Sequence, residues 1–200
     1  MRFPSVALLA AALAAAGCGA PRHAAPALDG LVPDPLPAKP AFMLTDTSGR
    51  PFAFAAATRG KLAYLYFGYT HCPNACPATM GDLSYALHHV PPAVRRQVEV
   101  VFVTVDPRRD TPPMLRRWLG HYGRWFVGLT GSERQIETAE REAGVPLAPP
   151  ERQQGASYAV QHASIVLAYS PDGLAHAVYT QGFSGQAYAH DMPLLLAKHG

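Results

Sequence analysis

The stretch 67-FGYTHCPNACPATM-80 decides the fold, because it joins a continuous apolar run to a helical pattern. The run 61-KLAYLYFGY-69 is apolar and aromatic, as is typical of a buried strand. After the two cysteines, apolar residues recur at helical spacing (Met80, Leu83, Leu87 and Val90). The valine-rich run 98-VEVVFVTVD-106 predicts a second strand. Strand, helix and strand in this order predict a parallel pair with a right-handed crossover.

Further patterns complete an α/β sandwich. Two short apolar runs flank a turn signal at 46–49 and predict a β-hairpin over 41–54. Helices are predicted from Thr111 to about residue 122 and, through the capping-box pair Ser132 and Gln135, up to about Gly144. Two strands about the turn at 170–173 and a last helix over 186–199 follow. The predicted fold class is α/β, and this order of elements is thioredoxin-like with an added N-terminal β-hairpin.

The composition of the 200-residue chain predicts one folded domain and no nucleic-acid partner. At 48% hydrophobic, the chain can bury one ordinary core. It has 17 Lys and Arg against 14 Asp and Glu, a net charge of +3, and its arginine pairs are scattered among acidic and apolar residues. Nucleic-acid binding would need a concentrated basic surface.

The N-terminus indicates export and lipidation. Arg2 precedes an apolar run, 6–16, that is too short to span a membrane, and small residues then lead to Cys18. The stretch 14–18 resembles the lipobox of bacterial lipoproteins, with Ala15 where leucine is commonest. We therefore expect residues 1–18 to be a signal peptide with lipidation at Cys18, 19–40 to be an Ala/Pro-rich linker, and 41–200 to be the domain. The expected location is the bacterial cell envelope, with a lipid anchor in a membrane.

Cys72 and Cys76 are the two thiols left for the domain, and their spacing permits three kinds of site. If a helix begins near Cys72, with Pro73 at its first position, the sulfurs lie one turn apart and can face one object. The helix N-terminus should then lower the pKa of both thiols. A structural disulfide, a redox dithiol and a metal site for Cu(I) or Zn all remain open.

His162 is the candidate third ligand, and its imidazole would let the site hold Cu(II) as well. It lies where a strand is predicted to begin, a setting in which an isolated histidine is more often a core residue. His71 should face away from its neighbour Cys72, and His88 and His89 are explained as caps of helix carbonyls. Met80 fits the apolar stripe of the helix better than a ligand role.

Five segments in register resemble the SCO/SenC family of copper-handling, thioredoxin-fold proteins. They are 42-FMLTDTSGRPF-52, 60-GKLAYLYFGYTHCPNACP-77, 106-DPRRDTP-112 with the valine before it, 128-GLTG-131 and 158-YAVQHASIVLAYSPDG-173. The resemblance covers the domain from about residue 42 to the tail. It implies that Cys72, Cys76 and His162 bind copper as Cu(I) or Cu(II).

The family's role implies a copper metallochaperone. Such a protein delivers copper to, or keeps reduced the cysteines of, the binuclear copper site of cytochrome c oxidase. Its expected partners are the copper-bearing oxidase subunit and a protein that reduces thiols. The alternative is a thiol-disulfide oxidoreductase or peroxidase-like protein that uses Cys72 and Cys76 for catalysis without stored metal. A third possibility is a structural lipoprotein without chemistry.

Residues beside the ligands add two expectations. The resemblance implies that Asp106 and Asp110 lie near the site, whereas turn and helix-cap chemistry would also explain them. The family commonly has acidic residues at the positions of Ser157 and Gln161 and a serine in place of Ala163. Loss of a carboxylate beside His162 would alter metal affinity or the imidazole tautomer without abolishing ligation.

Overall fold

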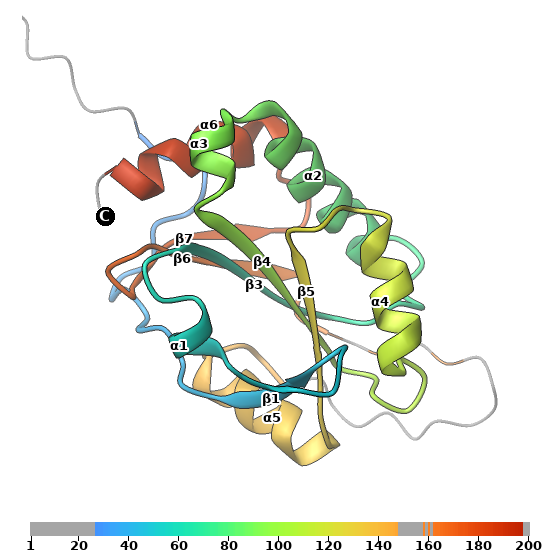
Figure 1. The fold of residues 1–200 in the computed structure, drawn as a ribbon. Helices are drawn as coiled ribbons and strands as arrows, with labels where there is room; N and C mark the ends of the chain where they lie inside the picture. The colour runs from blue at the N-terminus through green and yellow to red at the C-terminus, as the bar shows by residue number, and fades with distance from the viewer. Residues whose placement is uncertain (1–26, 148–157, 159, 161, 198–200) are drawn as a thin grey trace, which may run out of the picture.

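The computed structural model describes residues 27–147, 158, 160 and 162–197, which form a seven-stranded sheet with helices on both faces (Figure 1). The strand order is β2-β1-β5-β4-β3-β6-β7. The strands are β1 (Met43–Asp46), β2 (Pro51–Ala53), β3 (Leu62–Gly68), β4 (Val98–Thr104), β5 (Phe126–Thr130), β6 (Ile165–Tyr169) and β7 (Ala175–Thr180). The helices are α1 (Phe54–Ala57), α2 (Ala75–His89), α3 (Pro92–Arg95), α4 (Pro112–Gly120), α5 (Glu133–Glu142) and α6 (Gly185–Ala197).

The centre of the sheet confirms the predicted strand-helix-strand unit. β3 and β4 are parallel and in register from Leu62 opposite Val98 to Gly68 opposite Thr104. Every residue of β3 is buried, as its unbroken apolar run predicts. β6 lies antiparallel to β3 on its other side and turns back into β7. The fold is the thioredoxin-like α/β arrangement with an N-terminal hairpin.

The hairpin of β1 and β2 is confirmed, and it pairs with a strand that sequence patterns did not predict. β1 pairs antiparallel with β5, which itself lies parallel to β4. β5 is short and contains Gly128, so its pattern gives little strand signal. A Cβ atom at Gly128 would lie 2.7 Å from Leu119 of α4, so this glycine allows the helix to approach the strand.

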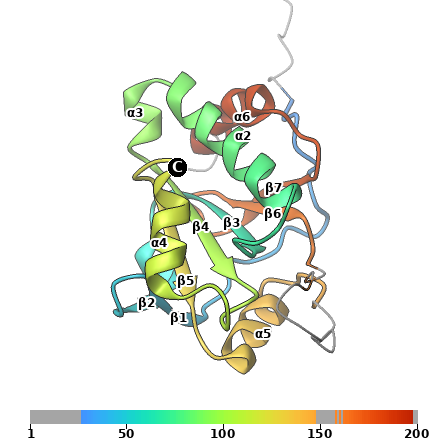
Figure 2. The same ribbon diagram turned by 90° about the vertical axis from the view of Figure 1, so that its right-hand side faces the viewer.

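The alternating residues of the strands divide the core into two layers (Figures 1 and 2). Tyr64, Tyr66 and Phe102 face α2, α4 and α6, whereas Leu65 and Val101 face α1 and α5. Figure 1 shows α2 and α6 above the sheet and α1 and α5 below it. Met80 is fully buried in the first layer, which confirms its assignment to the core. The capping box predicted for Ser132 and Gln135 is present at the start of α5.

α2 begins at Ala75, so the condition that the helix starts near Cys72, with Pro73 at its first position, is not met. The N–H of Cys72 donates to the carbonyl of Tyr69 at 3.2 Å in a turn, and Pro73 disfavours helical geometry for the residue before it. Pro77, rather than Pro73, occupies the first turn of the helix, where backbone N–H groups lack helical partners anyway.

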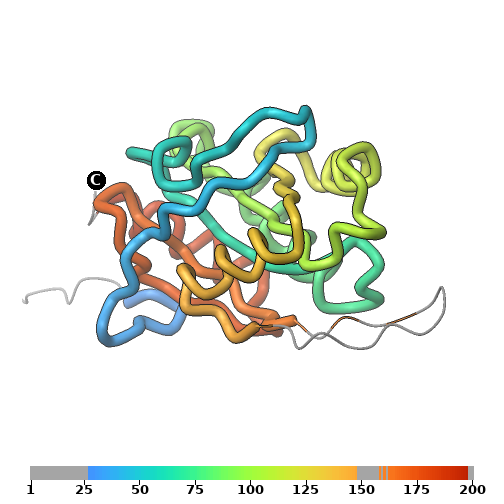
Figure 3. Tube along the Cα trace, turned by 90° about the horizontal axis from the view of Figure 1, so that it is seen from below, coloured from blue at the N-terminus to red at the C-terminus, as the bar shows by residue number. Residues whose placement is uncertain are grey.

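Residues 27–40, the described part of the expected linker, run along the edge of the sheet beside β7 (Figure 3). The N–H and carbonyl of Leu31 bond to Val178, and the N–H of Lys39 donates to Gly173. Nearer the start, the carboxylate of Asp191 in α6 accepts the N–H groups of Asp29 and Gly30 at 2.9 and 2.8 Å. The main chain of these residues is therefore held to the domain by hydrogen bonds to β7, to the turn before it and to the Asp191 side chain.

The expected signal peptide, including Cys18, lies outside the described residues. Within the described ranges, none of the helices combines the length and the apolar character needed to cross a bilayer.

Candidate metal centre

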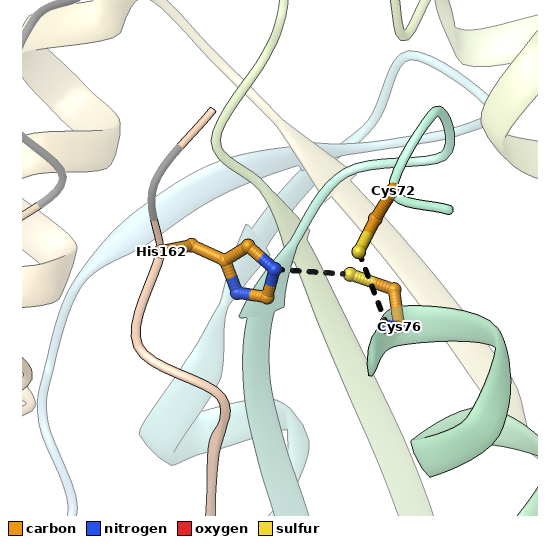
Figure 4. Close-up of side chains that lie close together, drawn as sticks. All are labelled: Cys72, Cys76 and His162. Atoms are coloured by element: carbon orange, nitrogen blue, oxygen red, sulfur yellow. Dashed lines mark hydrogen bonds between the residues drawn. The ribbon is translucent and has the colours of Figure 1, made fainter. Parts of the chain in front are cut away.

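Cys72, Cys76 and His162 converge at one edge of the sheet, where β3 and β4 end and β6 begins (Figure 4). Cys72 lies in the loop after β3, and Cys76 is the second residue of α2. His162 precedes β6 by three residues, so the strand starts later than its sequence pattern predicted. One ligand atom from each of the three residues lies within 4.8 Å of the other two, and Nε2 of His162 is 3.4 Å from Sγ of Cys76.

Gly68, the last residue of β3, makes room for the buried sulfur. A Cβ atom at this position would lie 2.7 Å from Sγ of Cys76 and 2.7 Å from the ring of Tyr66. Its nearest approach to the Phe102 ring would be 3.1 Å. Because real Cβ atoms essentially never lie as close as 2.7 Å to another heavy atom, a side chain here would displace the sulfur or the Tyr66 ring.

The two thiols have unequal surroundings. Cys72 is half-buried, whereas Cys76 is fully buried. Burial raises the pKa of the Cys76 thiol to about 12, so the prediction that the helix N-terminus would lower its pKa is wrong. The hydroxyl of Tyr66 donates to Sγ of Cys76 at 3.7 Å, and Sγ of Cys72 accepts the N–H of Cys76 at 3.4 Å.

The imidazole of His162 is held between two tyrosine rings. Tyr66 and Tyr69 meet it edge to face, with ring centroids at 5.9 and 5.6 Å. Burial lowers the pKa of His162, which favours the neutral form that ligates metals. Its Nδ1 is buried, and Nε2 lies 3.4 Å from Sγ of Cys76. Nε2 is therefore the nitrogen directed at the sulfurs.

The other candidate ligands stay outside this group. His71 is exposed, with Nδ1 3.2 Å from the hydroxyl of Thr70. His88 and His89 lie at the end of α2, each with Nδ1 2.7 Å from the carbonyl four residues earlier, in agreement with their prediction as caps. Ala163 is half-buried, whereas Ser157 and Gln161 lie outside the described residues.

Asp110 is connected to the cysteine loop and does not cap α4. Its carboxylate accepts the N–H of Thr70 at 2.9 Å and the hydroxyl of Thr104 at 2.7 Å, and it also bonds to the hydroxyl of Thr70. The N-cap of α4 is Thr111, without a side-chain hydrogen bond. Asp106 is likewise buried, and its carboxylate accepts the hydroxyl of Tyr158, four residues before His162. Sequence patterns do not reveal the Asp110 contact, because its partner Thr70 lies 40 residues away.

Two sulfurs and one imidazole nitrogen form a donor set that suits Cu(I), Cu(II) or Zn(II). One other group among the described residues has metal-ligand character, namely Asp29, His190 and Asp191. There, both oxygens of Asp191 already accept hydrogen bonds, from Asp29 and His190 on one and from Gly30 and Tyr179 on the other. The cysteine-histidine group is the better metal site.

Comparisons with known proteins identify the family. The sequence model of the SCO1/SenC family matches residues 33–197. A putative copper-binding protein of Stutzerimonas stutzeri is 34% identical over 134 residues, which are 67% of this chain and 65% of that relative. The chain spans about half the length of several mitochondrial relatives, 54% of one from Bos taurus.

Solved structures show the same fold. Apo Sco1 from Thermus thermophilus has a TM-score of 0.76 at 27% identity, with 85% of this chain and 98% of that chain covered. Copper-bound ScoI from Bradyrhizobium japonicum has a TM-score of 0.70 at 26% identity, with 80% and 99% covered. Because the family match extends over most of the chain, this protein belongs to the SCO1/SenC family.

Proposed function

We propose that this protein is a copper metallochaperone that binds copper through Cys72, Cys76 and His162. We further propose that it delivers the metal to the binuclear copper site of cytochrome c oxidase. The convergence of these three ligand atoms within 4.8 Å carries the proposal. A relative named as a copper-binding protein and a similar structure solved with copper bound support the choice of metal.

The unequal burial of the ligands suits transfer of the metal. Cys76 is buried, but Cys72 is half-buried in a loop whose neighbours His71, Pro73 and Asn74 are exposed. Three protein ligands leave copper able to accept a further one, so a cysteine of the recipient can bind before the donor releases the ion. Both thiols must be reduced for binding, which implies a reducing partner in an oxidising compartment.

The alternative, a thiol-disulfide oxidoreductase or peroxidase-like protein, is favoured by the proximity of the two free thiols. Its weakness is Cys76. Thiol exchange proceeds through thiolate, and the pKa of about 12 makes the buried Cys76 thiol a poor attacking group near neutral pH, so Cys72 would have to attack first.

Copper titration of the reduced protein against a competing Cu(I) chelator tests the proposal. We expect one copper per chain. His162→Ala should weaken binding by more than about 100-fold, since even loss of an outer partner of a ligand costs 10- to 100-fold. His121→Ala is the control, because this exposed histidine is not among the candidate ligands. A wild-type protein that reduces disulfides or peroxide but binds no copper would establish the alternative.

We also propose that residues 1–18 are a signal peptide and lipobox, and that Cys18 becomes the lipidated first residue of the mature protein, which would hold the domain at a membrane of the cell envelope. The motif at 14–18 supports this location. Cys18→Ser should release the protein from membranes and remove the lipid mass from its N-terminal peptide. Retention at the membrane by this variant would contradict the anchor.

A further inference from the structure

The turn between β4 and α4 contacts both segments that carry the metal ligands. On the cysteine side, Asp110 accepts the N–H of Thr70, two residues before Cys72. On the histidine side, Asp106 and Arg109 contact Tyr158, four residues before His162. A short turn without a ligand of its own therefore lies between the two halves of the site.

Arg109 contacts both the ring and the main chain of Tyr158. The carbon of its guanidinium lies 3.5 Å from the centroid of the Tyr158 ring, and Nη1 donates to the carbonyl of Tyr158 at 3.0 Å. The hydroxyl of Tyr158 donates to Oδ1 of Asp106 at 2.8 Å, and Oδ2 of Asp106 pairs with Nε of Arg109. The three side chains close a ring of contacts in which a planar cation covers an aromatic face.

The same guanidinium also reaches toward the wall of the metal site. Its carbon lies 5.7 Å from the centroid of the Tyr69 ring, and Tyr69 meets the imidazole of His162 edge to face. Nη2 of Arg109 is buried and has no hydrogen-bond partner among the described residues. Arg109 is thus connected to His162 through the chain at Tyr158 and through the ring of Tyr69.

The segment that carries His162 depends on such contacts, because Tyr158, Val160 and His162 all precede β6 and lie outside the ladder. We propose that Arg109 is a positioning residue that, with Asp106, holds Tyr158 and so keeps Nε2 of His162 beside Cys76. The expected effect of Arg109 on copper binding rests on the proposed function. The expected effect of Arg109 on the position of His162 in the metal-free protein does not.

The test compares wild type, Arg109→Met and the neighbouring Arg108→Met, an exposed arginine that controls for loss of charge. In the metal-free protein, amide hydrogen exchange at Val160 and His162 should speed up about tenfold in Arg109→Met, the size expected for loss of a partly buried cation–aromatic contact. Amides of β3 and β4 should keep their wild-type rates. Arg108→Met should match wild type throughout.

In the copper-loaded protein, Arg109→Met should lose the imidazole nitrogen signal in Cu(II) electron paramagnetic resonance, as His162→Ala does. Its copper affinity should fall roughly 10- to 100-fold. A role confined to overall stability would leave that signal intact. If wild type binds no copper, the proposed function fails while hydrogen exchange still decides the placement of His162.

If Arg109→Met does not fold, Arg109→Lys replaces it. Lysine keeps the charge beside Asp106 but lacks the planar group that covers Tyr158. Faster exchange at Val160 and His162 is expected there too. Wild-type exchange at both amides in whichever variant folds, or wild-type imidazole coupling in it, overturns the proposal.

Discussion

Replacing Gly68 by alanine tests whether the sheet is shaped around the sulfur of Cys76. The new Cβ would lie 2.7 Å from Sγ, so the sulfur must move by about 0.7 Å to reach an ordinary contact of 3.4 Å. Tyr66 and Phe102, the other neighbours, are fully buried and cannot move aside freely. Rotation of Cys76 about χ1 is the easiest escape, and it turns the sulfur away from His162.

Two opposing effects set the change in the free energy of unfolding caused by Gly68→Ala. Overpacking of a core costs about 1 to 3 kcal/mol, and the reduced entropy of the unfolded chain on Gly→Ala returns about 0.4 to 1 kcal/mol. We expect the free energy of unfolding to fall by about 1 to 2 kcal/mol, which lowers Tm by about 2 to 8 °C in a domain of this size. Copper affinity should fall at least about tenfold, because one ligand is displaced.

Gly81→Ala is the matched control. This glycine lies within α2, and a Cβ atom there would meet nothing within 4 Å. It should stabilise the protein by about 0.5 to 1 kcal/mol through helix propensity alone. Urea unfolding and chelator competition measure both variants. In a Cys76→Ala background, Gly68→Ala should lower the free energy of unfolding by less, because the sulfur that the new Cβ atom would contact is absent. Wild-type stability together with wild-type copper affinity in Gly68→Ala would refute the reasoning.

Two further predictions concern groups away from the metal site. Burial raises the pKa of Glu140 to about 7, so the folded protein holds this proton at pH 4 and loses it as the pH rises through 7. The free energy of unfolding should therefore decline over this range, and Glu140→Gln should remove up to about 3 kcal/mol of the decline. Urea unfolding at pH 5 and pH 8 measures it, and an unchanged decline would contradict the burial effect. Asp191→Asn should cost about 3 kcal/mol, because Gly30 and Tyr179 lose a buried carboxylate. Limited proteolysis should then cut near residue 30, and resistance there would show that Asp191 does not hold this segment.

The central unit of the fold was predictable because its signals are local. A continuous apolar run, a helical stripe and a second apolar run specify β3, α2 and β4 without knowledge of the rest of the chain. The capping box of Ser132 and Gln135 is equally local. β5 was not predictable in this way, because a five-residue strand with a central glycine owes its place to pairing with β4 and β1.

At the metal site, tertiary contacts outweigh the local sequence patterns on which the predictions were based. A helix N-terminus lowers the pKa of a nearby thiol, but Cys76 in α2 is buried against the end of β3, and the cost of burying a thiolate is larger. The start of α2 was misplaced because two proline rules compete: proline favours the first helical position, but it also excludes the residue before it from the helix. Asp110 looked like a cap because its partner Thr70 is distant in sequence.

The placement of His162 follows from the alternation of β6. Val166 pairs with Tyr66, and both side chains belong to the layer that faces α2. His162 precedes Val166 by four residues, an even number, so an extended chain directs both side chains to the same face. Since β6 runs antiparallel to β3, the residues before it lie at the edge where β3 ends and the cysteine loop begins. An odd spacing would direct the imidazole into the opposite layer, away from both sulfurs. The register of β6 thus brings together ligands that are 86 residues apart in the chain.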